Sequence, residues 1–97
     1  MQRKDFQKRR HLITQETKDR AVADLIAAYD SELNQKGMAI FASGHEVHGV
    51  IKEELDEFFD EVKKNGSKER KAAELLDIAV AALHGVASLH SGHMDWW

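Results

Sequence analysis

The stretch ELLDIAVAALHGVASL, residues 74–89, would be apolar on nearly every side of a helix, yet it contains two acids near its start. At about 100° per residue, its apolar side chains occupy three sides of the helix. Glu74 and Asp77 stand on the remaining side, which continues through His84 and small residues. This pattern is typical of a buried central helix, in which unpaired carboxylates are costly. We therefore expect a compensating cation beside these two acids.

A second acidic segment precedes this helix. IKEELDEFFDEV, residues 51–62, carries six acidic side chains and only one basic one. Within it, Glu54 and Glu57 repeat the i, i+3 spacing and flank the apolar stripe of their helix instead of its solvent side. An antiparallel hairpin of the two helices can bring the two acidic pairs face to face. Four such carboxylates, with Glu53 nearby, are hard oxygen ligands suited to Mg²⁺ or Mn²⁺.

The alternative interpretation of these acids is structural. A charge run is more commonly a solvated face of a helix. The acids of the apolar helix could also form salt bridges with Arg70 or Lys71, one turn earlier.

Three helices are expected to make up most of the chain. The first runs from about Thr14 to Lys36, and Gly37 follows as a left-handed C-cap. GMAIFASG, residues 37–44, is then a loop. The second helix opens with Ser43 and Glu46 in capping-box register.

The second helix ends at KKNGS, residues 63–67, because Asn65-Gly66 is a turn dipeptide. Ser67 can cap the third helix, which runs from about Lys68 to about His90. Each of the first two helices has one apolar stripe. The stripe residues are Val22, Leu25, Ile26, Tyr29 and Leu33 in the first helix, and Val47, Ile51, Leu55, Phe58 and Val62 in the second.

Composition describes one small globular domain. A chain of 97 residues, 42% hydrophobic and 32% charged, can bury only a modest core. The third helix is apolar on three sides, and the rest of a three-helix chain cannot cover all of them. We therefore expect an all-α, helical hairpin-based bundle whose core is completed by a homo-oligomer. The absence of Cys excludes a thiolate metal site and suits a reducing cytoplasm.

Charge and hydropathy limit the partners. No run approaches the roughly 18 apolar residues of a membrane span, and the N-terminus lacks the apolar core of a signal peptide. We therefore expect a cytoplasmic protein with no membrane partner. Residues 1–11 carry a local charge of +4 within a net charge of −3, which leaves −7 for the remainder. This acidic body argues against nucleic acid as the main ligand.

At the two acidic segments the chain resembles the MazG-like all-α nucleoside triphosphate pyrophosphohydrolases. The family pattern is E-E-x-x-E followed by E-x-x-D. In this sequence the matching residues are Glu53, Glu54 and Glu57, then Glu74 and Asp77. The segments GHEVHGVIKEELDEFFDEV and ELLDIAVAAL also resemble the two metal-binding helices of short, single-domain members.

The resemblance covers about residues 14–90, which we treat as one helical domain. Residues 1–13 form a basic N-terminal tail outside it, and residues 91–97 form a C-terminal tail. The family implies a dimer or a dimer of dimers. It also implies Mg²⁺-dependent hydrolysis of a nucleoside triphosphate to the monophosphate and pyrophosphate, with Mn²⁺ able to replace Mg²⁺. Several members clear surplus or non-canonical nucleotides, a house-cleaning role.

The resemblance also implies roles for individual carboxylates. Glu54, Glu57, Glu74 and Asp77 would be metal ligands. Glu53 would be an outer ligand or the base that aligns the attacking water, and Glu53, Glu54 and Glu57 together form the expected catalytic group.

Three further residues are candidate substrate ligands. His45, at the N-terminus of the second helix, can help to bind phosphate or base. Arg70 and Lys71 are either solubilising charges or the cations that hold the outgoing pyrophosphate. At Ala81, one turn beyond Asp77, some relatives place an aromatic residue near the nucleotide, so the base preference stays open.

Two other metal sites are disfavoured. His45 and His48 are an i, i+3 pair, as are His90 and His93, but neither pair has a third ligand at helical spacing for zinc. The Glu-x-x-His motif of carboxylate-bridged di-iron bundles does not occur. The rival function is that of a catalytically idle helical protein, for oligomerisation or regulation, which retains the acidic segments.

Overall fold

The protein is all-α in the part of the chain that the structure describes. A computed structural model describes residues 11–95, so the basic residues of the N-terminal tail lie outside the described range. The three helices are α2 (Gln15–Lys36), α3 (Gly44–Lys63) and α4 (Lys68–Ser91). No strand occurs among the described residues, and an isolated β-bridge joins Ser43 to Asp95. The predicted helices and their order are confirmed.

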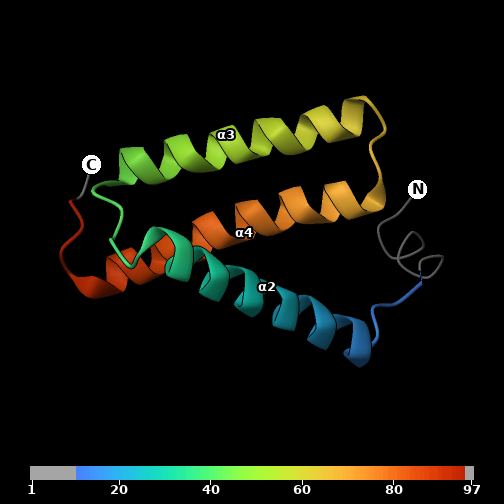
Figure 1. Cartoon of the computed structure of the whole chain (residues 1–97), viewed down its shortest axis with the longest axis horizontal. Helices are drawn as coiled ribbons and strands as arrows, with labels where there is room; N and C mark the ends of the chain where they lie inside the picture. The colour runs from blue at the N-terminus through green and yellow to red at the C-terminus, as the bar shows by residue number, and fades with distance from the viewer. Residues whose placement is uncertain (1–10, 96–97) are drawn as a thin grey trace, which may run out of the picture.

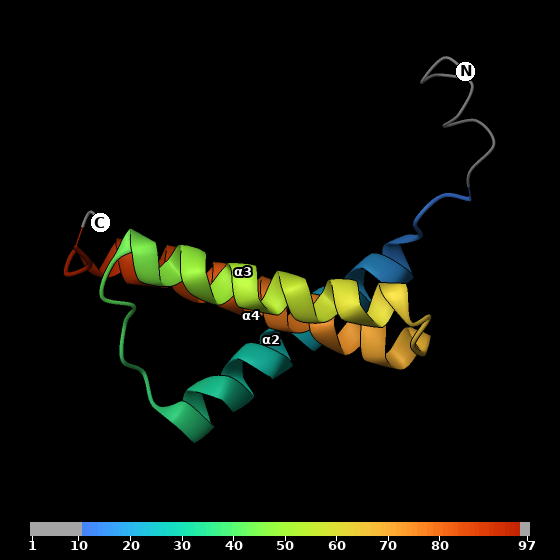
Figure 2. The same ribbon diagram turned by 90° about the horizontal axis from the view of Figure 1, so that it is seen from above.

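The helices α3 and α4 lie side by side and antiparallel, whereas α2 crosses α4 obliquely (Figures 1 and 2). The helix α4 contacts both of the others and is therefore the central one. A tight turn between α3 and α4 makes the hairpin possible. In this turn Asn65 adopts a positive φ of 51°, and the Gly66 N–H donates to the Glu61 carbonyl at 2.8 Å.

Each helix begins at a hydroxyl that accepts a backbone N–H three residues further on. These N-caps are Thr14, Ser43 and Ser67. The second half of the predicted capping box at α3 does not form. The Glu46 Oε1 atom accepts instead from the Ala42 N–H, at 2.6 Å, and so holds the end of the preceding loop.

Glycine ends two of the helices in different ways. Gly92 is the left-handed C-cap of α4, with φ 75° and ψ 4°. Gly37 also has a positive φ, 84°, but its ψ of −179° places it outside the left-handed helical region that we expected. Its N–H still donates to the Leu33 carbonyl at 2.9 Å. The chain therefore leaves α2 in an extended direction, toward the start of α3.

The central helix is only partly covered by the other two. Val80 and Ala81 of α4 are buried, as is Ser88, but the stripe of α2 is incompletely packed. Val22 and Ile26 remain 48% and 53% exposed. A single chain thus leaves apolar surface open, in keeping with the expected oligomer, which stays a prediction.

Among the described residues, α4 is long and apolar enough to cross a membrane by length and composition. Its most apolar window has a mean hydropathy of 1.5, so the expectation that no segment reaches this level was wrong. The physical reason is that α4 packs against two helices and has a further apolar side. Central helices of soluble proteins pass the same test, and Glu74 and Asp77 stand on this one.

Candidate metal centre

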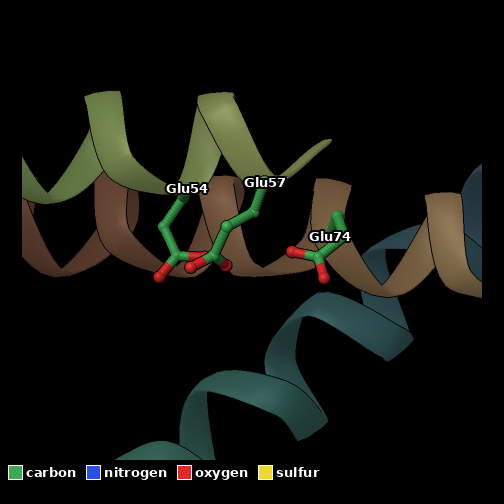
Figure 3. A group of neighbouring side chains, drawn as sticks. All are labelled: Glu54, Glu57 and Glu74. Atoms are coloured by element: carbon green, nitrogen blue, oxygen red, sulfur yellow. The ribbon is translucent and has the colours of Figure 1, made fainter. Parts of the chain in front are cut away.

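Three carboxylates converge between α3 and α4. Glu54 and Glu57 come from successive turns of α3, and Glu74 comes from α4. One oxygen of each carboxylate lies within 4.8 Å of the others. Figure 3 shows the three groups in a row on the side of the hairpin toward α2. The antiparallel pairing therefore brings together three of the four expected carboxylates, and Asp77 lies outside this group.

Two of these carboxylates have an oxygen without a partner. The Oε2 atoms of Glu54 and Glu74 are buried, and neither accepts a hydrogen bond. A buried carboxylate oxygen without a donor or a counter-ion destabilises the folded state. These atoms thus fit a ligand of positive charge.

The cluster raises the pKa values of its own members. Burial, followed by the neighbouring charges of Glu57 and Asp77, raises the pKa of Glu54 from an ordinary value of 4.5 to about 7. Burial first and then the Asp77 charge raise the pKa of Glu74. Each shift means that the charged form is disfavoured, because carboxylates held together repel one another in a poorly solvated place.

The fourth predicted ligand, Asp77, is more exposed and stands beside α2. Desolvation raises the pKa of Asp77 first, and the Glu32 charge is the next cause. Glu32 in turn forms an ion pair with Lys36, at 2.6 Å, one turn further along α2. The hydrogen bond and charge of Glu32 raise the pKa of Lys36. Sequence reasoning missed Glu32 and Lys36, because the apolar stripe of α2 does not tell which flank meets Asp77.

A cavity of about 430 Å³ adjoins the cluster at Glu54, whereas Glu57 and Glu74 do not line it. Its walls come from all three helices and from the connection between α2 and α3. Its acidic and basic lining residues are Glu32, Lys36, Glu46, Glu54 and Asp77. Its apolar lining residues include Leu33, Ile40, Phe41, Val50, Val80 and Ala81. One cavity therefore has a charged wall next to an apolar one.

Hydrogen bonds from α4 fix the connection that forms the cavity wall. The Ala39 carbonyl can only accept, so the His84 Nε2–H donates to it, at 2.8 Å. With neutral His84, Nδ1 must then accept from the Tyr29 hydroxyl, at 2.7 Å. The Ser88 hydroxyl accepts from the Phe41 N–H at 3.0 Å. The predicted small-residue face of α4 thus serves as the anchor of this loop.

The other predicted site residues are not among the three converging carboxylates. Glu53 is exposed, and it lies outside the group whose oxygens converge. His45 stands in the first turn of α3 and does not line the cavity. Arg70 is exposed, and the Lys71 Nζ donates to Asn65 Oδ1 at 3.4 Å. The substrate-binding roles of His45, Arg70 and Lys71 stay predictions.

The structural alternative for the acids can be examined directly. Within residues 11–95, no ion pair joins Arg70 or Lys71 to Glu74 or Asp77. The salt bridges that would explain two acids on an apolar helix therefore do not form. In the described part of the chain, the group of side chains that could hold a metal ion consists of carboxylates, and no histidine belongs to it.

One buried acid was not predicted. Glu61 is only 8% exposed, and it lies one turn beyond Glu57 on the same flank of α3. Its Oε2 atom pairs with the Lys64 Nζ at 3.0 Å, whereas its Oε1 atom has no hydrogen-bond partner. Its charge also contributes to the raised pKa of Glu74. This carboxylate lies against Gly66 of the tight turn, where a side chain would collide with it.

Comparison of the chain with protein-family models, with curated proteins and with solved structures found no match. The resemblance of the two acidic motifs to the MazG-like family therefore stays an expectation from the sequence.

Proposed function

We propose that this protein is a metal-dependent nucleoside triphosphate pyrophosphohydrolase that releases the monophosphate and pyrophosphate. The observation that carries the proposal is the convergence of Glu54, Glu57 and Glu74, with two buried oxygens left without partners, beside a cavity. The E-E-x-x-E and E-x-x-D motifs at these positions supply the reaction class by resemblance.

The residues present fit a divalent cation. Their donors are all carboxylate oxygens, which suit hard ions such as Mg²⁺ and Mn²⁺. Glu54, Glu57 and Glu74 would hold the ion, with Asp77 beside them. When bound, the ion supplies charge neutralisation, polarisation of the phosphoryl oxygens and activation of a water molecule.

The cavity fits the organic part of a nucleotide. Its volume of about 430 Å³ falls within the ordinary range of small-molecule sites. Its apolar wall, which includes Phe41 and Ile40, can cover a base and sugar, while its charged wall includes Glu54 of the carboxylate cluster. Lys36 stands on that charged wall and can attract phosphate oxygens, a role for which the sequence offered Arg70 and Lys71 instead.

The position of each acid favours different tasks. Glu54 is partly buried and has a pKa of about 7, so a bound cation would favour its ionised form near neutral pH. Glu57 contributes an oxygen to the cluster and is exposed, so it can both bind and accept a proton from an attacking water. Glu53 is exposed and lies outside the cluster, so we assign to it the orientation of that water.

The direct test is incubation of the full chain with a panel of common and damaged nucleoside triphosphates in millimolar Mg²⁺. Pyrophosphate and the monophosphate should appear together, without inorganic phosphate. The matched pair of variants is Glu54→Gln, which should be inactive, and Asp56→Asn, which should be fully active. Asp56 forms only an exposed ion pair with Lys52 on the same helix. Absence of turnover with every nucleotide would favour the catalytically idle helical protein.

A further inference from the structure

A second hollow lies at one end of the α3/α4 hairpin. It is a groove of about 600 Å³, lined by the first turns of α3 and the last turns of α4. Its apolar side chains are Val47, Ile51, Val86, Leu89 and Met94. On α4, Val86 stands about half a turn away from Asp77. The groove shares no lining residue with the cavity beside Glu54, so the two hollows are separate.

Small residues on both helices give the groove its depth. Gly44, Ala82 and Gly85 line it. A Cβ atom at Gly85 would stand 3.1 Å from the Val47 side chain, so the two helices approach closely there. Beside this contact, Leu89 is 61% exposed. An exposed apolar surface with a hollow is typical of a docking site.

The chain itself leads into this groove. Met94 and Asp95 are the last residues that the structure describes, and both line the groove. The Asp95 N–H donates to the Ala42 carbonyl at 2.8 Å, and a parallel β-bridge joins Asp95 to Ser43. Figure 1 shows this end of the described chain beside the start of α3. Because the two paired segments run in the same direction, the chain after Asp95 is directed along the first turn of α3, where Gly44 begins the groove.

The two residues after Asp95 are Trp96 and Trp97, and the chain has no other Trp. Both lie outside the described range. A Trp side chain buries about 150–250 Å² when it packs, so two indoles left in water are unfavourable. Two extended residues span about 7 Å, and the α3 side of the groove, from Gly44 to Ile51, is about 10 Å long. We propose that the Trp96-Trp97 segment docks in this groove of its own chain.

The lining of the groove suits this occupant. Most of it is apolar, as an indole requires, and His48 and Asp95 can accept a hydrogen bond from an indole N–H. The groove of a second copy is the competing place for the same two side chains. Docking within one chain is favoured, because the bond between Asp95 and Ala42 already holds the segment at the groove and little further entropy is lost.

Docking of this segment would also hold the loop that forms the cavity wall. Ala42, whose carbonyl binds Asp95, directly follows Phe41, which lines the cavity. Release of the segment should therefore speed amide hydrogen exchange in residues 39–42. The docking does not depend on the proposed enzymatic function, and a failure to hydrolyse nucleotides would leave it unaffected.

The first test is the fluorescence of the full chain, which reports on Trp96 and Trp97 alone. In native buffer we expect emission at shorter wavelength than in urea, and weaker quenching by acrylamide. Leu89→Glu, in the groove, should move emission and quenching to the values of the unfolded chain. Leu75→Glu is the matched control, since Leu75 is 50% exposed on the same helix but does not line the groove. It should behave like the parent.

Circular dichroism establishes that both variants fold. Emission of the parent at the wavelength of the unfolded chain would overturn the proposal. A folded Leu89→Glu variant with the emission and quenching of the parent would overturn it as well.

A second test does not depend on a disruptive substitution, and it tells one chain from two. The chain has no cysteine, so Trp97→Cys and His48→Cys can be combined and oxidised. His48 is exposed and lines the groove. A disulfide needs Cα atoms within about 7 Å, so a docked segment should form one within a single chain. Asp56→Cys with Trp97→Cys, two turns further along α3, should not form one. A disulfide between two chains, or no difference between the two pairs, would overturn the proposal.

Discussion

Glu54 and Glu74 approach each other from antiparallel helices, with an oxygen of each within 4.8 Å, and each keeps a buried Oε2 atom without a hydrogen-bond partner. Two acids held in this way repel one another and lose solvation, so both charged forms are disfavoured. The arrangement is unfavourable for an empty structure and favourable for one that binds cations. Its consequences can be measured without knowledge of the substrate.

The first prediction concerns pH. In chelator, folded Glu54 keeps its proton up to a pKa of about 7, whereas the unfolded chain releases it near 4.5. The folded state therefore binds more protons between these values, and the contribution of Glu54 to stability falls as pH rises through this window. Glu54→Gln should melt higher than the parent by a few degrees near pH 8, and the difference should shrink toward pH 4.5. Thermal unfolding across this range measures it.

Asp56→Asn is the control for this pH series, since Asp56 is exposed and pairs with Lys52 at 3.2 Å. Its melting temperature should run parallel to that of the parent at every pH. A constant gap between the parent and Glu54→Gln would mean that Glu54 titrates normally.

The second prediction concerns metal. Millimolar Mg²⁺ or Mn²⁺ should raise the melting temperature of the parent, because the ion binds the folded cluster far better than the unfolded chain. Asp77→Asn should melt no lower than the parent in chelator and should gain much less from Mg²⁺. The measurement is thermal unfolding at matched ionic strength, which removes the general effect of salt. Equal shifts in the two proteins would show that Asp77 takes no part in the site.

The third prediction concerns turnover. On any nucleotide that the parent hydrolyses, Glu54→Ala and Asp77→Ala should each lower kcat/KM by at least about a hundredfold, as the loss of a metal ligand does. Glu53→Gln distinguishes the two outer roles of Glu53. If it orients the water, kcat should fall while the Mg²⁺-dependent shift in melting temperature is kept. Normal kcat in Glu53→Gln would show that Glu53 does not orient the water.

The fourth prediction concerns the loop that forms the cavity wall. Ser88 is 0% exposed, and its Oγ atom accepts from the Phe41 N–H and donates to the His84 carbonyl at 2.8 Å. Ser88→Ala should lower the free energy of unfolding by about 1–3 kcal/mol, because the Phe41 N–H loses its partner. Urea unfolding checks this. Ser31→Ala, at an exposed hydroxyl of α2, should change it by less than about 0.5 kcal/mol.

The sequence was sufficient for the helices and for the pairing of the acidic motifs, for local reasons. Caps such as Ser43 and Ser67 act within one turn, and the Asn65-Gly66 turn reverses the chain direction. Because that reversal is short, α3 and α4 must be neighbours, and the facing of Glu54 and Glu74 follows from their spacing.

The contribution of α2 could not be predicted in this way. Glu32 and Lys36 reach the cavity because α2 crosses α4 at a particular angle, which depends on packing between residues far apart in sequence. His84 and Ser88 looked like members of a small-residue face, and nothing local indicates that they hold Ala39 and Phe41. Glu61 was likewise hidden, since its burial arises from the geometry of the turn after α3.

The two sets of contacts also differ in how soon the chain can form them. The hairpin closes through a turn between Lys63 and Lys68, whereas α2 and its loop reach His84 from 55 and 45 positions away. Short loops close at lower entropic cost, so α2 should dock last in folding and detach first in partial opening. Detachment of α2 removes one wall of the cavity, so the same motion would open the cavity to a ligand. Amide hydrogen exchange should then be faster in α2 than in α4, and a bound ligand should slow it most in α2.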